Sequence, residues 1–240
     1  MEMQQLAGGG VVVMLAGIIR GITGFGGAML MAPALSLLLG PVPAVVTALM
    51  LETAAAVVMF PDAWPRFNRR VLFYLTAPAC VTVPIGGYLL VNLDAFLMRK
   101  VIAGVVVVFA LALLSGRRYS GAPRPATSLV LGSIVGVLLG ATSVGAPPVI
   151  LYVLAGSDSQ AVIRANLTVF VTAISVIGLI MLSAIGAVTA PVASYAGLAV
   201  IPFLVGTWLG GRLFGRLNEF VARRIALGLM LFMGIIGLVI

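Results

Sequence analysis

Two short stretches of the sequence place glycine, hydroxyl and charged residues inside otherwise apolar runs. The first is RGITGFGGAMLMAPAL, from Arg20 to Leu35, and the second is GATSVGAPPVILYVL, from Gly140 to Leu154. If a helix begins just after each glycine cluster, its first backbone N–H groups are unpaired and carry the positive end of the helix dipole. Glycine has no side chain to keep a ligand from that backbone. The chemistry suggested by these residues is the binding of a small anion between two helix N-termini.

The candidate substrate-binding residues come mainly from these two clusters. Hydroxyls at the second cluster are suited to capping or binding, and a proline there suits the first turn of the next helix. For any single glycine, close helix packing is the more usual role in a membrane protein. The candidates are Arg20, Thr23, Gly24, Phe25, Gly26 and Gly27 in the first cluster, Thr142, Ser143, Gly145 and Pro147 in the second, and Asn166 from a later apolar segment.

Arg20 and Glu52 are the ionisable side chains that we expect within the apolar segments. Charged groups at membrane depth are costly and usually functional. Glu52 lies in the middle of ALMLETAAAVVMF. Two interpretations stay open, namely a structural Arg20–Glu52 ion pair and a proton carried by Glu52 whose movement drives anion transport. Arg164, at the start of a later segment, is interpreted as an anchor at the membrane surface in preference to a substrate contact.

The composition indicates that lipid surrounds most of the chain. Of the 240 residues, 62% are hydrophobic and 8% are charged, whereas a soluble domain carries roughly 25% charged residues. The sequence therefore predicts an all-α polytopic membrane protein. The net charge of +8 is better explained by membrane orientation than by nucleic-acid binding. Cys80 is the only cysteine and histidine is absent, so no disulfide, metal or cofactor is expected, and the start of the chain suggests no cleavable signal peptide.

Eight apolar segments follow one another between the charged loops and turn signals. A single crossing needs about 20 residues, and the first and fifth segments, which hold the two glycine clusters, are longer than that. The segments are 9–39, 43–60, 71–91, 96–115, 129–155, 161–183, 191–211 and 221–239.

The chain repeats itself. PIGGYLLVNLDAFLMRKVIAG (84–104) aligns with WLGGRLFGRLNEFVARRIALG (208–228) at an offset of 124 residues, and an offset of 119 aligns the two glycine clusters. We therefore expect a first transmembrane repeat at 1–115, a polar linker at 116–128 and a second repeat at 129–240.

The positions of lysine and arginine favour one topology. If all eight segments cross the membrane, and Arg20 is set aside as buried, the two faces receive six and seven basic residues. If segments 9–39 and 129–155 are re-entrant hairpins, the faces receive two and eleven. The positive-inside rule expects the second, uneven distribution, with the eleven in the cytoplasm. Each repeat is then a broken hairpin plus three crossing helices, the repeats are inverted, and half-helices of ~13 residues bring each tip about 20 Å into the membrane.

The same residues resemble a known family. RGITGFGGAMLMAPAL with LMLET, GATSVGAPPVILYVL followed by AVIRANLTVF, and PIGGYLL followed by LMRKVIAG are similar to the TauE/SafE sulfite exporter family over essentially the whole chain. The resemblance implies a bacterial inner-membrane carrier for sulfur-containing or carboxylated organic anions such as sulfite or sulfonates. Many members carry glycine where this chain has Ala28 and Ala146. The residues that match the family motifs are Gly24, Gly26, Gly27, Thr142, Gly145 and Pro147.

The sequence predicts a secondary anion transporter that works by alternating access, and not an enzyme. We expect it in the bacterial inner membrane, with the linker 116–128 in the cytoplasm. Its expected partners are a small anion and the lipid bilayer, without nucleic acid, and a homodimer is one option for its assembly. The first alternative is a passive anion channel. An intramembrane enzyme is less favoured because few polar groups are available to form a catalytic set, and a structural subunit because it would not need two glycine clusters in register.

Overall fold

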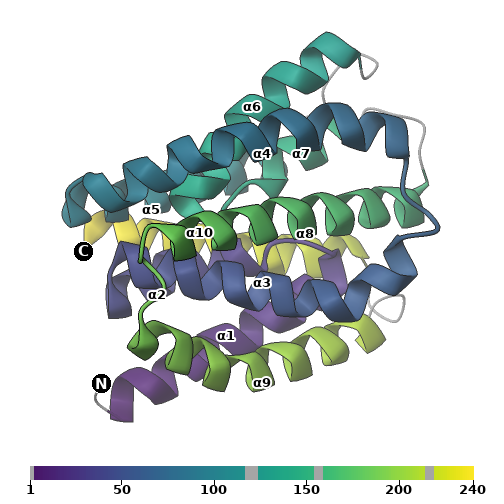
Figure 1. Cartoon of the computed structure of the whole chain (residues 1–240). Coiled ribbons are helices and arrows are strands. Elements are labelled where there is room, and N and C mark those ends of the chain that lie inside the picture. The colour runs from purple at the N-terminus through teal and green to yellow at the C-terminus, as the bar shows by residue number, and fades with distance from the viewer. Residues whose placement is uncertain (1–2, 117–123, 154–158, 214–218) are drawn as a thin grey trace.

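A computed structural model describes residues 3–116, 124–153, 159–213 and 219–240, and the described chain is almost entirely α-helical (Figure 1). The apolar residues that the sequence analysis assigned to membrane segments form these helices. They are α1 (Met3–Thr23), α2 (Gly27–Leu39), α3 (Pro41–Ala63), α4 (Arg69–Asn92), α5 (Ala95–Leu114), α6 (Pro125–Thr142), α7 (Ala146–Val153), α8 (Gln160–Ala184), α9 (Ala190–Leu213) and α10 (Glu219–Val239). The prediction of an all-α polytopic membrane protein is confirmed.

Both glycine-containing segments are broken into two helices at the predicted places. The first segment forms α1 and α2, separated at residues 24–26, and the other forms α6 and α7, separated at residues 143–145. The first arms are longer than the expected half-helices, because α1 has 21 residues and α6 has 18. Helix α6 also begins within the predicted linker, at Pro125, where proline suits the first helical position. Of that linker, residues 117–123 lie outside the described residues.

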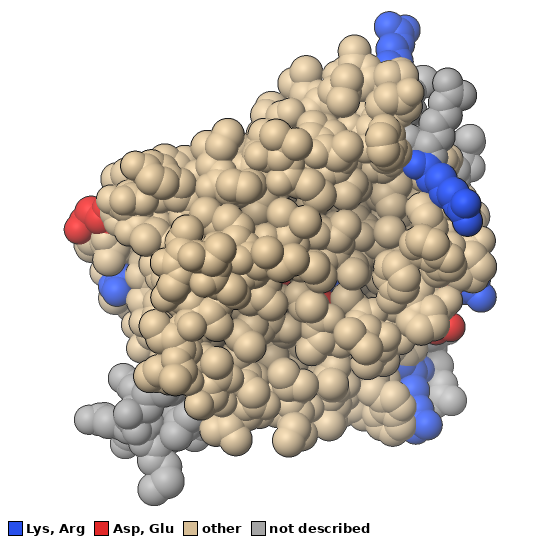
Figure 2. Space-filling model, in the orientation of Figure 1, with Lys and Arg blue, Asp and Glu red and all other residues tan. Residues whose placement is uncertain are grey.

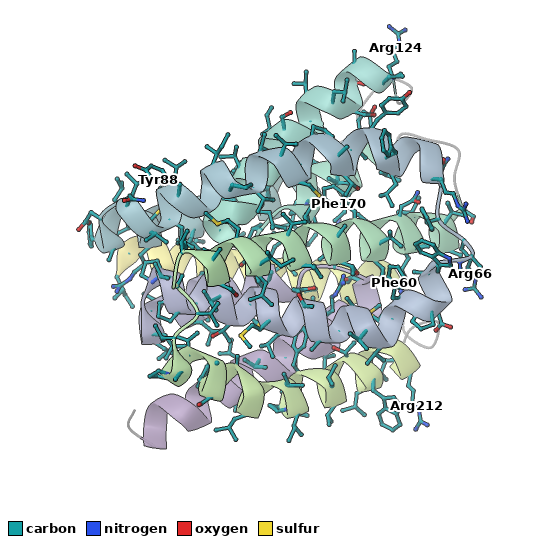
Figure 3. The ribbon with its side chains drawn as sticks, in the orientation of Figure 1. Phe60, Arg66, Tyr88, Arg124, Phe170 and Arg212 are labelled. Atoms are coloured by element: carbon teal, nitrogen blue, oxygen red, sulfur yellow. The ribbon has the colours of Figure 1, made fainter. Side chains whose placement is uncertain are left out.

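The broken segments enter the helical bundle from opposite sides. In Figure 1 both chain ends lie on one side, together with the start of α1 and the end of α2. Arg66, Arg124 and Arg212 lie on the other side and Tyr88 on the first (Figure 3). The end of α7 returns to the start of α6, where the Tyr152 hydroxyl accepts the backbone N–H of Arg124 at 2.9 Å. The arrangement is that of two hairpins, with α3, α4, α5, α8, α9 and α10 running between the two sides.

Six helices in the described part of the chain are long and apolar enough to cross a membrane. Helix α6 belongs to this set by its length and composition. Helix α10 does not, because its apolar stretch, Arg224–Val239, is shorter. The lysine and arginine side chains gather mainly at the edge of the molecule that carries Arg66, Arg124 and Arg212 (Figures 2 and 3). This uneven distribution is the one expected for the hairpin topology.

Each hairpin packs against a helix of the other half of the sequence. Helix α1 lies along α9, and α6 lies along α4. A Cβ atom at Gly21 would overlap the carbonyl oxygen of Thr207, and one at Gly140 would overlap the carbonyl oxygen of Val83. The two glycines are 119 residues apart and their contacts are 124 apart, which are the two offsets of the predicted repeat. These glycines allow close helix packing, and the inverted repeat itself stays a prediction.

The topology has a direct test with single cysteines at Gln4, Leu93 and Ser115 in a Cys80→Ala background. With hairpins, Gln4 and Leu93 lie on one face and Ser115 on the other, because three helices cross before residue 115. We expect a membrane-impermeant thiol reagent applied to right-side-out vesicles to label the first two and not the third. Labelling of Gln4 and Ser115 together, with Leu93 protected, contradicts the hairpins and indicates eight full crossings.

Candidate anion site at the two helix breaks

The first break is formed by glycines in a backbone conformation that other residues rarely adopt. Gly24 has φ 78° and Gly26 has φ 88°, both in the left-handed region. The Thr23 hydroxyl donates a hydrogen bond to the carbonyl oxygen of Ile19 at 2.8 Å. The chain therefore leaves helix α1 at Thr23 and starts α2 at Gly27 in a new direction, with the first N–H groups of α2 facing the protein interior.

Arg20 and Glu52 meet at this break as a buried ion pair. Arg20 is 0% exposed and Glu52 is 3% exposed. The Nε atom of Arg20 lies 2.9 Å from Oε2 of Glu52, and Nη1 of the same guanidinium donates to the carbonyl oxygen of Gly24. The other carboxylate oxygen, Oε1, accepts the backbone N–H of Ala28 at 3.1 Å. One carboxylate thus binds both the arginine and the start of α2.

These contacts form an anion-binding arrangement that already contains an anion. A helix N-terminus and a guanidinium each favour a negative group, and the Glu52 carboxylate satisfies both. Gly27 makes room for it, since a Cβ there would lie 2.8 Å from Oε1. Among the described residues no acceptor bonds Nη2 of Arg20, although this atom is buried. The guanidinium therefore keeps a donor for a further acceptor.

The second break has the same length as the first, three residues, and different chemistry. Ser143 adopts a left-handed conformation with φ 58° between α6 and α7. Its hydroxyl donates to the carbonyl oxygen of Thr142 at 2.6 Å. The Thr142 hydroxyl donates to the carbonyl oxygen of Leu138 at 2.6 Å and accepts the N–H of Val144 at 3.2 Å. Both hydroxyls therefore stabilise the turn itself.

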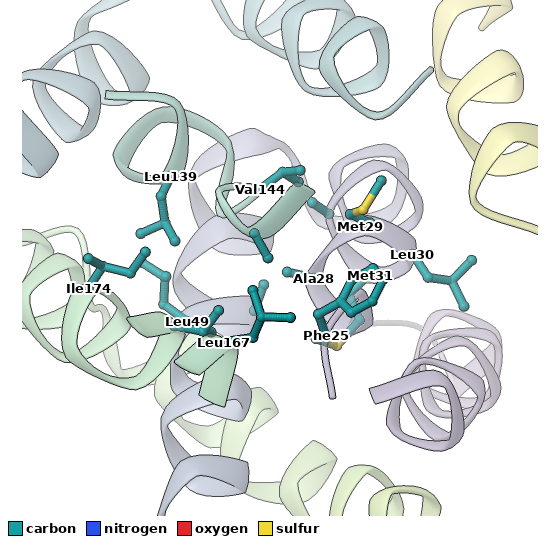
Figure 4. Packing of buried hydrophobic residues seen from close by; sticks show 14 of the residues in the cluster. Phe25, Ala28, Met29, Leu30, Met31, Leu49, Leu139, Val144, Leu167 and Ile174 are labelled. Atoms are coloured by element: carbon teal, nitrogen blue, oxygen red, sulfur yellow. The ribbon is translucent and has the colours of Figure 1, made fainter. Parts of the chain in front are cut away.

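A small cavity lies between the two breaks. It comprises about 280 Å³ of space between atoms, part of which is open to the surroundings. Phe25, Ala28 and Met29 approach it from one hairpin, while Leu139 and Val144 approach it from the other (Figure 4). The full lining is Arg20, Phe25, Gly26, Ala28, Met29, Glu52, Leu139, Ser143, Val144, Gly145, Ala146, Pro147 and Val171.

The candidate residues from the sequence fall into two groups around this cavity. Those that line it are Arg20, Phe25, Gly26, Ser143, Gly145, Pro147 and Glu52. Thr23, Gly24, Gly27 and Thr142 shape the breaks beside it. Asn166 lies elsewhere, since its Oδ1 atom accepts the backbone N–H of Asn68 at 2.7 Å and ties α8 to the segment before α4. A substrate contact for Asn166 remains a prediction that nothing in this geometry favours.

Several lining residues were not among the candidates, because they are apolar and carry no signal of their own. Leu139 and Val171 are the informative ones. They lie 119 residues after Arg20 and Glu52, at the offset that aligns the two glycine clusters. The repeat was the signal that could have found them.

A larger open cavity lies on the side that carries most of the arginines. It holds about 1430 Å³, part of which is open to the surroundings, and Asp62, Arg66, Arg164, Thr168 and Arg212 are among its lining residues. We call it the vestibule. The guanidinium carbon of Arg212 lies 3.7 Å from the centre of the Trp208 ring, an arrangement that favours cation–π attraction.

Arg164 lies between the vestibule and the first break. Its Nη2 atom donates to the carbonyl oxygen of Gly21 at 2.9 Å, and its aliphatic stem packs on Gly24. The side chain is therefore bound to protein backbone at the floor of the vestibule. This contact differs from the surface anchor expected for Arg164.

Comparison with known proteins gives one result. A family model described as "Sulfite exporter TauE/SafE" matches residues 10–236. Searches of curated proteins and of solved structures gave no match. Within the described residues, no group of three or more His, Cys, Asp or Glu side chains could hold a metal ion.

The coupling within the ion pair can be measured with Arg20→Leu, Glu52→Leu and the double variant. Removal of one partner leaves a buried unpaired charge, which we expect to lower the free energy of unfolding by about 3–5 kcal/mol. The double variant leaves no charge, so we expect it to regain most of that stability. Unfolding in mixed detergent micelles provides the measurement. Additive losses in the double variant would show that the two side chains do not stabilise one another.

Proposed function

The chain belongs to the TauE/SafE sulfite exporter family, and from this membership we propose that it is a secondary transporter for a small sulfur-containing or organic anion. The family is a transporter family, and the chain forms a multi-pass helical membrane protein. Our proposal adds that the substrate binds in the cavity between the two breaks. We also propose the bacterial inner membrane as its location, with the arginine-rich vestibule and the linker in the cytoplasm, because positive charge collects on that face.

The observation that carries this proposal is the position of the Glu52 carboxylate. It binds the N–H of Ala28, at the start of α2, together with the Arg20 guanidinium, and a bound substrate anion would require donors of this kind. Glu52 therefore acts as an internal anion that fills the site in the absence of substrate. The substrate and the carboxylate compete for the same donors.

This competition can couple anion binding to proton binding at Glu52. When Glu52 takes up a proton, its neutral form no longer compensates Arg20, and a substrate anion replaces it at the guanidinium and at the start of α2. When the proton leaves, the carboxylate returns and expels the anion. The charged groups that face the carboxylate are Arg20 from α1 and the N-terminal end of α2, with Arg164 of α8 behind the break. In this mechanism the anion and the proton cross the membrane together.

The hairpin arrangement suits alternating access to such a site. Discontinuous helices that enter from opposite faces and meet in the membrane are typical of secondary transporters. The vestibule provides one approach, and Arg164 lies across its floor between the open space and the first break. We propose that rocking of the two halves opens the cavity to each side in turn. Assembly as a homodimer stays a prediction.

A passive channel is the competing proposal, and substrate counterflow separates the two. In liposomes loaded with unlabelled anion, a carrier accumulates labelled anion transiently against its gradient, whereas a channel only equilibrates it. We expect counterflow. Its absence under conditions in which the protein conducts the anion contradicts a carrier mechanism.

The role of Glu52 can be tested with Glu52→Gln in liposomes. Glutamine resembles the neutral carboxyl group, so we expect anion exchange to continue while uptake driven by a pH gradient falls to the level of empty liposomes. Asp62→Asn is the matched control, because this carboxylate lines the vestibule and not the cavity, and it should keep the pH-driven uptake. Unchanged proton dependence in Glu52→Gln removes Glu52 from the coupling mechanism.

A further inference from the structure

The wall of the cavity at the first break is charged and the wall at the second break is apolar. This difference limits which anions can bind. We propose that the site selects an anion with a single negative charge and a short apolar substituent. The charged group binds at the first break, and the substituent lies against the second break. This inference rests on the proposed transport function and specifies the chemistry of the substrate for the same cavity.

Both charges of the ion pair are replaced by aliphatic residues in the second half of the chain. At an offset of 119 residues Arg20 corresponds to Leu139 and Glu52 corresponds to Val171. The helix starts agree with this offset, since α2 and α7 begin at residues 27 and 146, and α3 and α8 at residues 41 and 160. All four side chains line the cavity. The cavity thus has a charged wall and, at the corresponding positions, an aliphatic wall.

The N-termini of α2 and α7 differ in the backbone N–H groups that they offer. In α2 the first residues Gly27, Ala28 and Met29 all carry a backbone N–H, and Ala28 donates its own to Glu52. In α7 the residues after Ala146 are Pro147 and Pro148, which have no N–H to donate. The sequence predicted that a small anion binds between two helix N-termini. The second start offers fewer donors, and it is therefore a poor site for a charged group.

The two hydroxyl groups of the second break already donate their protons within the turn. The protons of Thr142 and Ser143 are donated to backbone carbonyls of α6. A hydroxyl has one proton to donate, so neither group offers a donor to an anion in this arrangement. The groups that remain on this wall are apolar side chains, chiefly Leu139, Val144, Pro147 and Val171. They favour contact with an apolar substituent over contact with an anionic oxygen.

The charge of the cavity lining limits the charge of the substrate. Arg20 is the one cation that lines the cavity within the described part of the chain. With Glu52 protonated, one negative charge on the substrate balances the guanidinium. A dianion leaves one charge uncompensated in a buried site, which is strongly unfavourable. The site therefore favours a singly charged substrate, in contrast to doubly charged sulfate.

The inference is tested first on the unmodified protein with a series of anions. The series is sulfate, sulfite, methanesulfonate, ethanesulfonate and propanesulfonate, with acetate and propionate as a second arm that tests the head group. Isothermal titration of purified protein in detergent measures the affinities at a pH of about 6. We expect ethanesulfonate to bind about fourfold more tightly than methanesulfonate, because one further CH₂ is buried, and at least tenfold more tightly than sulfate. Equal or tighter binding of sulfate or sulfite overturns the inference.

Two matched variants test whether the apolar wall of the cavity causes the preference for the longer substituent. Val171→Thr keeps the shape of the side chain and replaces a methyl group by a hydroxyl on the apolar wall. We expect it to reduce the fourfold preference for ethanesulfonate over methanesulfonate to less than twofold. Val169→Thr is the control, because Val169 lies on the same helix, is also buried, and does not line the cavity. A preference that survives in Val171→Thr, or that is lost equally in Val169→Thr, contradicts the assignment of this wall.

The same measurements separate this inference from the proposed function. If no anion binds the wild-type protein, or if binding is unchanged in the double variant Arg20→Leu/Glu52→Leu, the site itself is wrong. If anions bind and require Arg20 but show no dependence on the apolar substituent, the transport proposal stands and the substrate inference fails. Should Val171→Thr fail to fold, the wild-type series still decides the question.

Discussion

A guanidinium and a carboxylate that are both excluded from water must compensate one another, because either alone is strongly destabilising at membrane depth. Arg20 and Glu52 meet this requirement, and the geometry around them follows from it. Gly27 leaves room for the carboxylate, the left-handed glycines turn α2 so that the N–H of Ala28 reaches it, and the carbonyl of Gly24 accepts from the arginine. A continuous helix through this segment would present neither that N–H nor that carbonyl, since both would be paired within it.

A break of the same length occurs in the second half of the chain without any charge. The left-handed residue at that position is Ser143 in place of Gly24, the helix restarts after the same number of residues, and Leu139 and Val171 replace the ion pair. A break in a membrane helix therefore does not require an ion pair when local hydrogen bonds satisfy the turn. In the proposed mechanism the charges at the first break bind the charged group of the substrate, and the aliphatic side chains at the second break contact its uncharged part.

Sequence reasoning predicted the helices and both breaks well, because apolar length, glycine clusters and prolines act locally. It identified Arg20 and Glu52 because ionisable groups are rare within apolar segments. It did not predict that Asn166 would bind the backbone of Asn68, or that the Thr142 and Ser143 protons would remain within the turn. Those partners depend on how helices far apart in sequence come together. The apolar wall was missed for a related reason, since Leu139 and Val171 resemble every other aliphatic residue of the chain until the two repeats are compared.

Each hairpin packs against a helix from the other half of the chain, so the two packed surfaces form at different times during synthesis. Helix α4 is already synthesised when its partner α6 appears, but α1 must wait for α9, which follows most of the chain. At translation rates of about 5–20 residues per second, the first hairpin spends roughly ten seconds or more in the membrane without the helix that covers its glycine face. During that interval a buried arginine and glutamate have only each other as charged partners. Because the ion pair joins α1 and α3, both charges are compensated as soon as α3 has been made, long before α9 is available.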